Sequence, residues 1–289
     1  MTSMKKFCIA AQGGGMVACY HSGVISALKE KFGFHKLSRV IATSGAAATY
    51  SYLVSGQQEL IQPIWADLVG GGKFVTPWKF PPGKRVMNID FLVDEIIRKK
   101  YPVDLQALNT SPVRFEVGVT DAGTGDSVFF PMESRVDFFE LLRASCCVPY
   151  VSRDKVMIDG RAYCDGTIGS VSGLERTGNE ENILLVLTRP DRPLKKLHLL
   201  RKIMGWLLIR GETRELRDAI WDVMARYNDI PRHVKQIRRT KNIAVIQPKK
   251  PLPIFRIDTS LDRMTRTIRQ GYTDTMEHTG LDEFFARMA

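Results

Sequence analysis

One serine stands among small residues in the segment "IATSGAAATY". Ser44 follows an apolar run and precedes a run of helix-forming residues, with Gly45 and Ala46 directly after it. A nucleophilic serine on a sharp turn from a strand into a helix needs small neighbours, because such a turn is crowded and strained. A serine that only caps the helix would leave the same pattern. The segment by itself allows both interpretations.

A turn of three glycines, "QGGGMVA", precedes Ser44 in the chain and separates another apolar run from another helical pattern. Such a turn gathers backbone N–H groups that can bind a phosphate or the oxyanion of an acyl transfer. The Lys and Ser/Thr of a phosphate-binding Walker loop are absent, and no acidic residue follows about twenty positions on, where a dinucleotide site needs one. The oxyanion role therefore fits the sequence better than nucleotide binding.

A serine nucleophile needs a base. None of the five histidines lies in a recognisable motif, and His278, in "TMEHTG", is better explained as a solvated loop residue. The segment "MIDGRAYCDGTIGSV" offers two aspartates instead. Asp159 lies between strand-like runs, where Asp-Gly predicts a hairpin turn. Asp165 is followed by small residues that leave room for a neighbour, so it is the candidate base.

The elements around these residues alternate between strand and helix patterns. Strand, glycine or serine turn, and helix occur twice in the first half, which is typical of a parallel sheet covered by helices. Later segments predict a hairpin with its turn at "DAGTGD", a helix, two strands and a C-terminal helix ending "LDEFFARMA". We expect one domain over 1–289, with an α/β core at about 5–190 and a helical, basic portion at about 191–289.

The composition is that of an ordinary globular protein, with 44% hydrophobic and 25% charged residues in a chain of 289. No apolar run approaches the length of a membrane span, and the N-terminal apolar run is too short for a secretory signal. Five cysteines without a C-x-x-C pair indicate reduced thiols and no zinc site. We expect a cytoplasmic protein, with peripheral attachment to a membrane as an option.

The net charge of +11 allows an anionic membrane surface, an acidic substrate or nucleic acid as a partner. Nucleic acid is disfavoured because its recognition motifs are missing. Residues 195–210 combine five basic residues with apolar ones, as in a helix that lies in a membrane interface. A helix that covers the core while its lysines reach solvent fits equally well. The candidate membrane contacts are Lys195, Lys196, Arg201, Lys202, Trp206 and Arg210.

Four segments occur in the order and rough spacing of the motifs of patatin-like phospholipases: "GGGMVACYHSGVISAL", "ATSGAA", "RASCCVPYV" and "YCDGTIGSV". Between about Lys5 and Pro190 the chain resembles this family of serine acylhydrolases, and the segment "KNIAVIQPKKPLPI" is similar to its bacterial members. The resemblance implies a three-layer α/β/α sandwich with a mostly parallel central sheet.

The resemblance also implies the roles of the site residues. Ser44 would be the nucleophile and Asp165 its base, without cofactor, metal or calcium. Amides around Gly13, Gly14 and Gly15 would stabilise the oxyanion. The remaining motif positions are the elbow residues Ala42, Thr43, Gly45 and Ala46 and the Asp-Gly segment residues Gly166 and Thr167.

Several positions depart from the family pattern. Val17 and Ala18 replace a basic residue and a glycine after the glycine turn, Ala42 and Ala46 replace the outer glycines of the elbow, and Thr167 replaces a small residue. The main expectation is a lipid acyl hydrolase of phospholipase A type. Two alternatives remain open: a weakly active or non-catalytic lipid-binding relative, and a soluble carboxylesterase or thioesterase.

Overall fold

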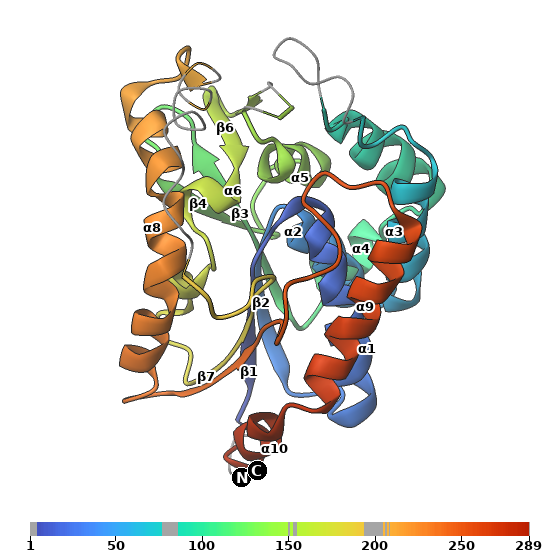
Figure 1. Cartoon of the computed structure of the whole chain (residues 1–289), viewed down its shortest axis with the longest axis vertical. Helices are drawn as coiled ribbons and strands as arrows, with labels where there is room; N and C mark the ends of the chain where they lie inside the picture. Colours follow the sequence, from blue (N-terminus) through green and yellow to red (C-terminus); the bar gives the residue numbers. More distant parts are fainter. Residues whose placement is uncertain are drawn as a thin grey trace.

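A mixed β-sheet with helices on both faces forms the protein (Figure 1). The computed structural model describes residues 5–76, 86–149, 151–152, 155–193, 205, 207 and 209–288. Neighbouring strands are parallel along β8 (Asn242–Ile246), β7 (Asn182–Val186), β1 (Phe7–Ala11), β2 (Leu37–Thr43) and β3 (Arg114–Asp121). The antiparallel strands are β4 (Ser127–Pro131), β5 (Val156–Ile158) and β6 (Arg161–Asp165). The predicted three-layer α/β/α class is confirmed.

Alternate residues of the inner strands pack on opposite faces. Ile9 of β1 contacts the larger core cluster and Ala10 the smaller one, which explains why this strand is apolar at every position. Helix α8 (Arg214–Ile237) covers the face of the sheet that carries the smaller cluster. The face that carries the larger cluster is covered by α1 (Tyr20–Lys31), α2 (Gly45–Val54), α3 (Ile61–Gly70), η4 (Phe91–Lys100), α5 (Phe138–Cys146), α9 (Leu261–Met276) and α10 (Thr279–Ala286). Shorter helical segments are η1 (Gly15–Cys19), η2 (Gln58–Leu60), α4 (Leu105–Thr110), α6 (Gly166–Gly169) and η5 (Leu174–Thr177).

The C-terminal portion contains the predicted strand, but its last helix is divided. Strand β8 extends the sheet, and the predicted C-terminal helix is two helices, α9 and α10, separated at Glu277 and His278. Helix α9 packs closely on α1, since a Cβ at Gly23 would lie 1.9 Å from the backbone oxygen of Ile268. None of the described helices is long and apolar enough to cross a bilayer.

Two strands meet end to end along one edge of β3. Gly118 of β3 pairs with Thr43 on that edge and with Phe129 of β4 on the other. The next residue, Val119, again pairs with β4 on the far edge. On the edge where β2 has ended, Val119 pairs with Asp165 of β6. Because β2 runs parallel to β3 and β6 runs antiparallel, both strands end at this point. Ser44, directly after β2, is thereby brought to Asp165.

Both predicted hairpins are confirmed. Strands β3 and β4 are joined over Ala122 to Asp126. Strands β5 and β6 are joined by Asp159 and Gly160 alone, which have φ values of 49° and 78°. A two-residue turn of this type needs positive φ at both positions, and Asp-Gly supplies it.

The junction of β2 and β6 requires a residue without a side chain at Gly166. A Cβ there would lie 2.1 Å from the backbone oxygen of Gly118. We expect Gly166→Ala to lower the free energy of unfolding by about 1–3 kcal/mol, as overpacking of a rigid site does. Chemical denaturation followed by circular dichroism measures this.

Gly70→Ala is the matched control, because a Cβ at Gly70 has no atom within 4 Å. Alanine is a better helix former than glycine, so this variant should be as stable as the wild type or more stable by up to about 1 kcal/mol. Equal stability of both variants would mean that the strand junction is not close-packed.

Candidate active site

Ser44 lies on a strained turn between β2 and α2, with φ 55° and ψ −135°. Ser44 and Asp159 are the non-glycine residues with positive φ in the described part of the chain. The turn is held from the neighbouring strand, because the Ser44 N–H donates to the Ser145 hydroxyl at 2.8 Å and that hydroxyl donates to the Gly118 oxygen at 2.7 Å. Ser145 belongs to the quoted segment "RASCCVPYV", and the sequence did not suggest this role. It fixes the backbone of the serine, which points to a nucleophile elbow rather than a simple cap.

The small residues around Ser44 allow α2 to approach the glycine turn. Ala42 and Ala46 are fully buried. A Cβ at Gly45 would lie 2.9 Å from the Cβ of Ala18 and 3.1 Å from the Gly15 oxygen. Thr43 links the two turns, since its hydroxyl accepts a hydrogen bond from the Gly13 N–H at 3.2 Å.

Asp165 is buried at the start of α6, where Oδ1 accepts a hydrogen bond from the Thr167 N–H at 2.8 Å. Its backbone is fixed by Cys147 and by the Thr120 hydroxyl. Burial raises the pKa of the Asp165 carboxyl above its ordinary value, although hydrogen bonds from Ser44 and Thr167 and the charge of Arg256 oppose the shift. The serine hydroxyl and a carboxylate with raised basicity therefore form a contact.

The glycine turn passes directly beside Ser44. A Cβ at Gly13 would lie 2.8 Å from the Cβ of Ser44 and 2.8 Å from the Thr167 hydroxyl. Gly15 has a φ of 60°, and a Cβ there would lie 2.7 Å from the Arg256 oxygen. The Gly13 N–H is used by Thr43, whereas those of Gly14 and Gly15 donate to no group that the structure describes. Of the three predicted donors, these two are available to a ligand.

A buried polar network supports the glycine turn from behind. The Gln12 side chain accepts hydrogen bonds from the Thr188 N–H and hydroxyl, both at 2.9 Å, and donates to the Val171 oxygen. The His21 ring donates to the Gln12 oxygen at 2.7 Å, and burial lowers the pKa of His21 to about 4. His21 is thus a neutral structural residue. A glutamine at the end of an apolar strand is the signal that could have indicated this network.

The other histidines lie away from Ser44 or outside the described residues. His35 and His233 are exposed, and His198 is not described. His278 was expected to be solvated, but it is half-buried and donates to the Val245 oxygen of β8 at 2.8 Å. Strands β7 and β1 separate β8 from β2, so the contact holds α10 to the sheet edge.

An apolar pocket opens at Ser44. Helices α2 and α3 form much of its wall. The rest comes from the connection between α3 and η4, from the start of η4, from Cys146 at the end of α5 and from Val148 just after it. Burial raises the pKa of the Cys146 thiol well above its ordinary value, so this neighbour of Ser44 stays protonated. The main lining side chains are Ala48, Tyr52, Ile61, Ile64, Trp65, Leu68, Phe74, Met87, Ile89 and Leu92.

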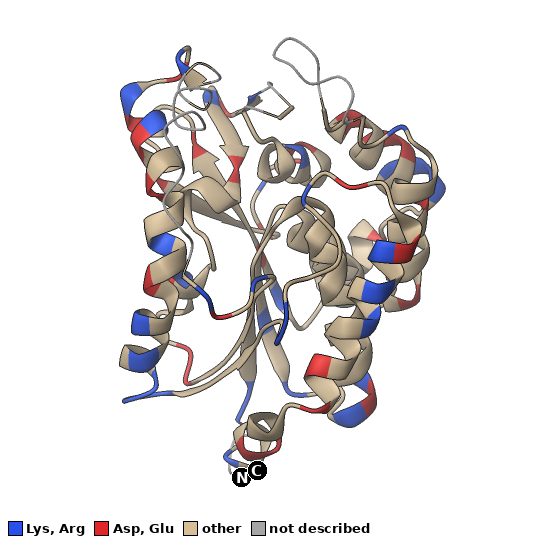
Figure 2. Cartoon of the chain, viewed as in Figure 1, with Lys and Arg blue, Asp and Glu red and all other residues tan. Residues whose placement is uncertain are grey.

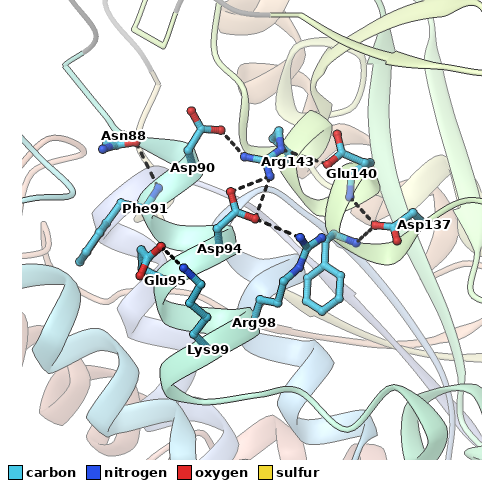
Figure 3. Close-up of polar contacts among 11 residues, drawn as sticks. Asn88, Asp90, Phe91, Asp94, Glu95, Arg98, Lys99, Asp137, Glu140 and Arg143 are labelled. Carbon is cyan, nitrogen blue, oxygen red and sulfur yellow. Dashed lines mark hydrogen bonds and ion pairs between the residues drawn. The ribbon is translucent and has the colours of Figure 1, made fainter.

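Ion pairs fasten α5 to the pocket wall (Figure 3). Arg143 of α5 pairs with Asp90 just before η4 and with Asp94 within it, the latter at 3.0 Å. Asp94 also pairs with Arg98 at 3.4 Å, and the Arg98 guanidinium lies over the Phe139 ring. This network holds the helix that carries Ser145, so Arg143 acts on the position of the elbow.

The described residues also bear on the expected absence of a metal site and on the candidate membrane contacts. The described residues contain no group of three or more His, Cys, Asp or Glu side chains arranged for a metal ion. Of the candidate membrane contacts, Lys195, Lys196, Arg201, Lys202 and Trp206 lie outside the described residues, and Arg210 is exposed.

Two known proteins and one family model are similar to this chain. The chain is 20% identical over 279 residues to the uncharacterized protein YjjU of Escherichia coli K12, covering 90% of this chain and 75% of YjjU. The fold is similar to that of VipD from Legionella pneumophila, with a TM-score of 0.56 and 14% identity, covering 95% of this chain and 66% of VipD. The family model of the patatin-like phospholipases matches residues 9–175. The chain therefore belongs to the patatin-like phospholipase family.

Proposed function

We propose that this protein is a phospholipase A-type lipid acyl hydrolase that uses Ser44 and Asp165. The observation that carries the proposal is the contact between a serine on a strained turn and a buried carboxylate at the mouth of an apolar pocket. Backbone amides that donate to no described group lie beside the same serine.

In the proposed reaction, Asp165 accepts the Ser44 proton while the serine oxygen bonds to the acyl carbon. The oxyanion that forms accepts hydrogen bonds from Gly14 and Gly15. The intermediate then expels the alcohol, which takes the proton from Asp165. A water molecule attacks the acyl-serine, Asp165 accepts a proton again, and the fatty acid leaves as Ser44 recovers its proton. The chain's own groups handle every charge and proton, so we expect activity to persist in a chelator.

The pocket supports a fatty acyl group as the part of the substrate that is bound. Its wall is formed mainly by aliphatic and aromatic side chains, and it begins at Gly15 and Ser44, where the ester would react. Burial of hydrocarbon in such a pocket contributes about 0.8 kcal/mol for each CH₂ group.

Two arginines beside the glycine turn favour a phosphate-bearing ester over a neutral one. The guanidinium carbons of Arg189 and Arg256 lie 5.1 and 5.9 Å from the centroid of the Tyr227 ring. Burial and the like charge of Arg256 hold the pKa of Arg189 below its ordinary value. An anionic headgroup would relieve this repulsion, which a neutral acylglycerol could not do.

Ser44→Ala and Asp165→Asn should each lower the turnover of a phospholipid by at least about 10³-fold, because the pair acts as one unit. Asn at 165 still accepts the Thr167 N–H but cannot take a proton. Hydrolysis of vesicle-borne phospholipid measures turnover, and a fluorophosphonate that labels the wild type but not Ser44→Ala identifies the nucleophile.

Asp159→Asn is the matched control, because Asp159 is an exposed residue of a hairpin turn whose positive φ suits asparagine. It should keep wild-type turnover. Full activity of Ser44→Ala would refute the proposal. An unlabelled wild type that still binds lipid would instead support a non-catalytic relative.

The raised pKa of Asp165 also predicts a cost in stability. The folded state disfavours the carboxylate, so stability falls as the pH rises from the ordinary value of 3.8 through the raised pKa. Asp165→Asn should therefore melt about 2–4 °C above the wild type at neutral pH, and the difference should shrink as the pH is lowered. Thermal melts over a pH series measure this, and a lower melting temperature at neutral pH would contradict it.

Ala48→Phe should shorten the acyl pocket, because Ala48 is a buried lining residue near Ser44. We expect at least a tenfold loss on long-chain esters and little change on a short soluble ester, since the phenyl group adds about six heavy atoms that fill space for the hydrocarbon chain. Ala48→Ser, which keeps the pocket volume, is the control. An equal loss on both substrates would indicate damage to the elbow instead.

A further inference from the structure

Exposed apolar side chains gather in the connection between β8 and α9. In the described part of the chain, large hydrophobic residues with high exposure are Met157, Leu207, Phe255, Ile257 and Leu261. Three of them lie within the segment 255–261, where Phe255 is 67% exposed, Leu261 50% and Ile257 40%. Such a concentration usually marks a surface that contacts a partner.

The segment 255–261 is firmly built. The buried carboxylate of Asp258 accepts hydrogen bonds from the N–H groups of Phe255 at 3.1 Å and Ser260 at 2.9 Å. It also accepts two from the Arg263 guanidinium, both at 2.8 Å. Ile254, just before the segment, is buried. The fold therefore holds Phe255 and Ile257 outward, and their exposure does not result from a loose chain.

The same segment lies against the glycine turn. The Arg256 oxygen accepts a hydrogen bond from the Met16 N–H at 3.0 Å, and a Cβ at Gly15 would lie 2.7 Å from that oxygen. Gly15 also lines the apolar pocket at Ser44. The connection thus follows the edge of the sheet where β1 and β2 end, as the trace from β8 to α9 shows (Figure 1).

We propose that the segment 255–261 docks the protein on an anionic lipid surface. Phe255 and Ile257 present exposed apolar side chains on a firm segment, which suits the boundary between headgroups and acyl chains. Arg256 between them donates to the Tyr227 hydroxyl at 3.1 Å. The net charge of +11 adds attraction to an anionic leaflet, and Figure 2 shows Lys and Arg residues spread over the helices among Asp and Glu. Docking there brings the glycine turn and the pocket mouth to the lipid. The proposal concerns binding and does not depend on hydrolysis.

Fluorescence tests the contact directly. Phe255→Trp should shift its emission to shorter wavelength on vesicles of phosphatidylcholine with about a quarter phosphatidylglycerol, and less on phosphatidylcholine alone. Thr240→Trp is the matched control, because Thr240 is exposed and precedes β8, at the opposite end of the parallel strands. No shift at 255, or an equal shift at both positions, would overturn the proposal.

A double variant tests the consequence for binding and activity. Phe255→Ser with Ile257→Ser should weaken cosedimentation with these vesicles at least about tenfold, given the apolar area lost, while Phe255→Leu with Ile257→Leu should retain it. Hydrolysis of a short soluble ester should stay within about twofold of the wild type in both. Unchanged vesicle binding of the serine variant would overturn the proposal.

Size-exclusion chromatography provides a further test. If the wild type forms a dimer that the serine variant does not form, and the wild type does not bind vesicles, the segment is a protein interface and the proposal is overturned. Vesicle binding is also measured for the Ser44→Ala protein and compared with lipid hydrolysis by the wild type. A Ser44→Ala protein that is inactive and still binds vesicles supports both proposals, whereas a wild type that binds vesicles but hydrolyses no lipid refutes the hydrolase and leaves the docking segment supported.

Discussion

The edge of β3 that β2 and β6 share is the constraint on which the site depends. The two strands approach from opposite ends and stop at neighbouring residues, Gly118 and Val119. Ser44, directly after β2, and Asp165, at the end of β6, therefore lie close together as a result of strand pairing and not of helix packing. The glycines at 118 and 166 make this junction close enough, since a Cβ at Gly166 would overlap the Gly118 backbone.

Two buried carboxylates near this edge have opposite environments. Glu116 of β3 is fully buried and forms ion pairs with Arg39, Arg114 and Arg176. Asp165 is held by hydrogen bonds from a backbone amide and hydroxyl groups, and Arg256 only adds a distant charge. Three guanidinium groups thus surround the Glu116 carboxylate, whereas burial raises the pKa of the Asp165 carboxyl. The ion pairs give Glu116 a structural role, and the surroundings of Asp165 support the proposal that it is the base.

Polar residues behind the site hold its backbone in place. Ser145 fixes the elbow, Gln12 and Thr188 fix the glycine turn, and Arg143 fixes the helix that carries Ser145. The segment 255–261 adds a hydrogen bond from the opposite side, at Met16. The proposed oxyanion site would work through preorganised donors, for which rigid support of this kind matters as much as the donors themselves.

The sequence alone determined the fold class and pointed to the small set of residues at the site. Apolar runs followed by glycine or serine and then by helical periodicity are local patterns, so β1, β2, α1, α2 and the Asp159 hairpin could be predicted from neighbours in the chain. Ser44 and Asp165 were identified because small residues surround both.

Only the tertiary structure decided which groups meet. The pairing of β6 with the edge left by β2, the use of the Gly13 amide by Thr43, and the contact of Arg256 with the glycine turn join residues 30 to more than 200 positions apart. Such contacts depend on strand order and register, which periodicity does not encode. The exposure of Phe255 and Ile257 also could not be predicted from the sequence, because apolar residues are expected to be buried. The hydrogen bonds of Asp258 hold this segment so that both side chains face outward.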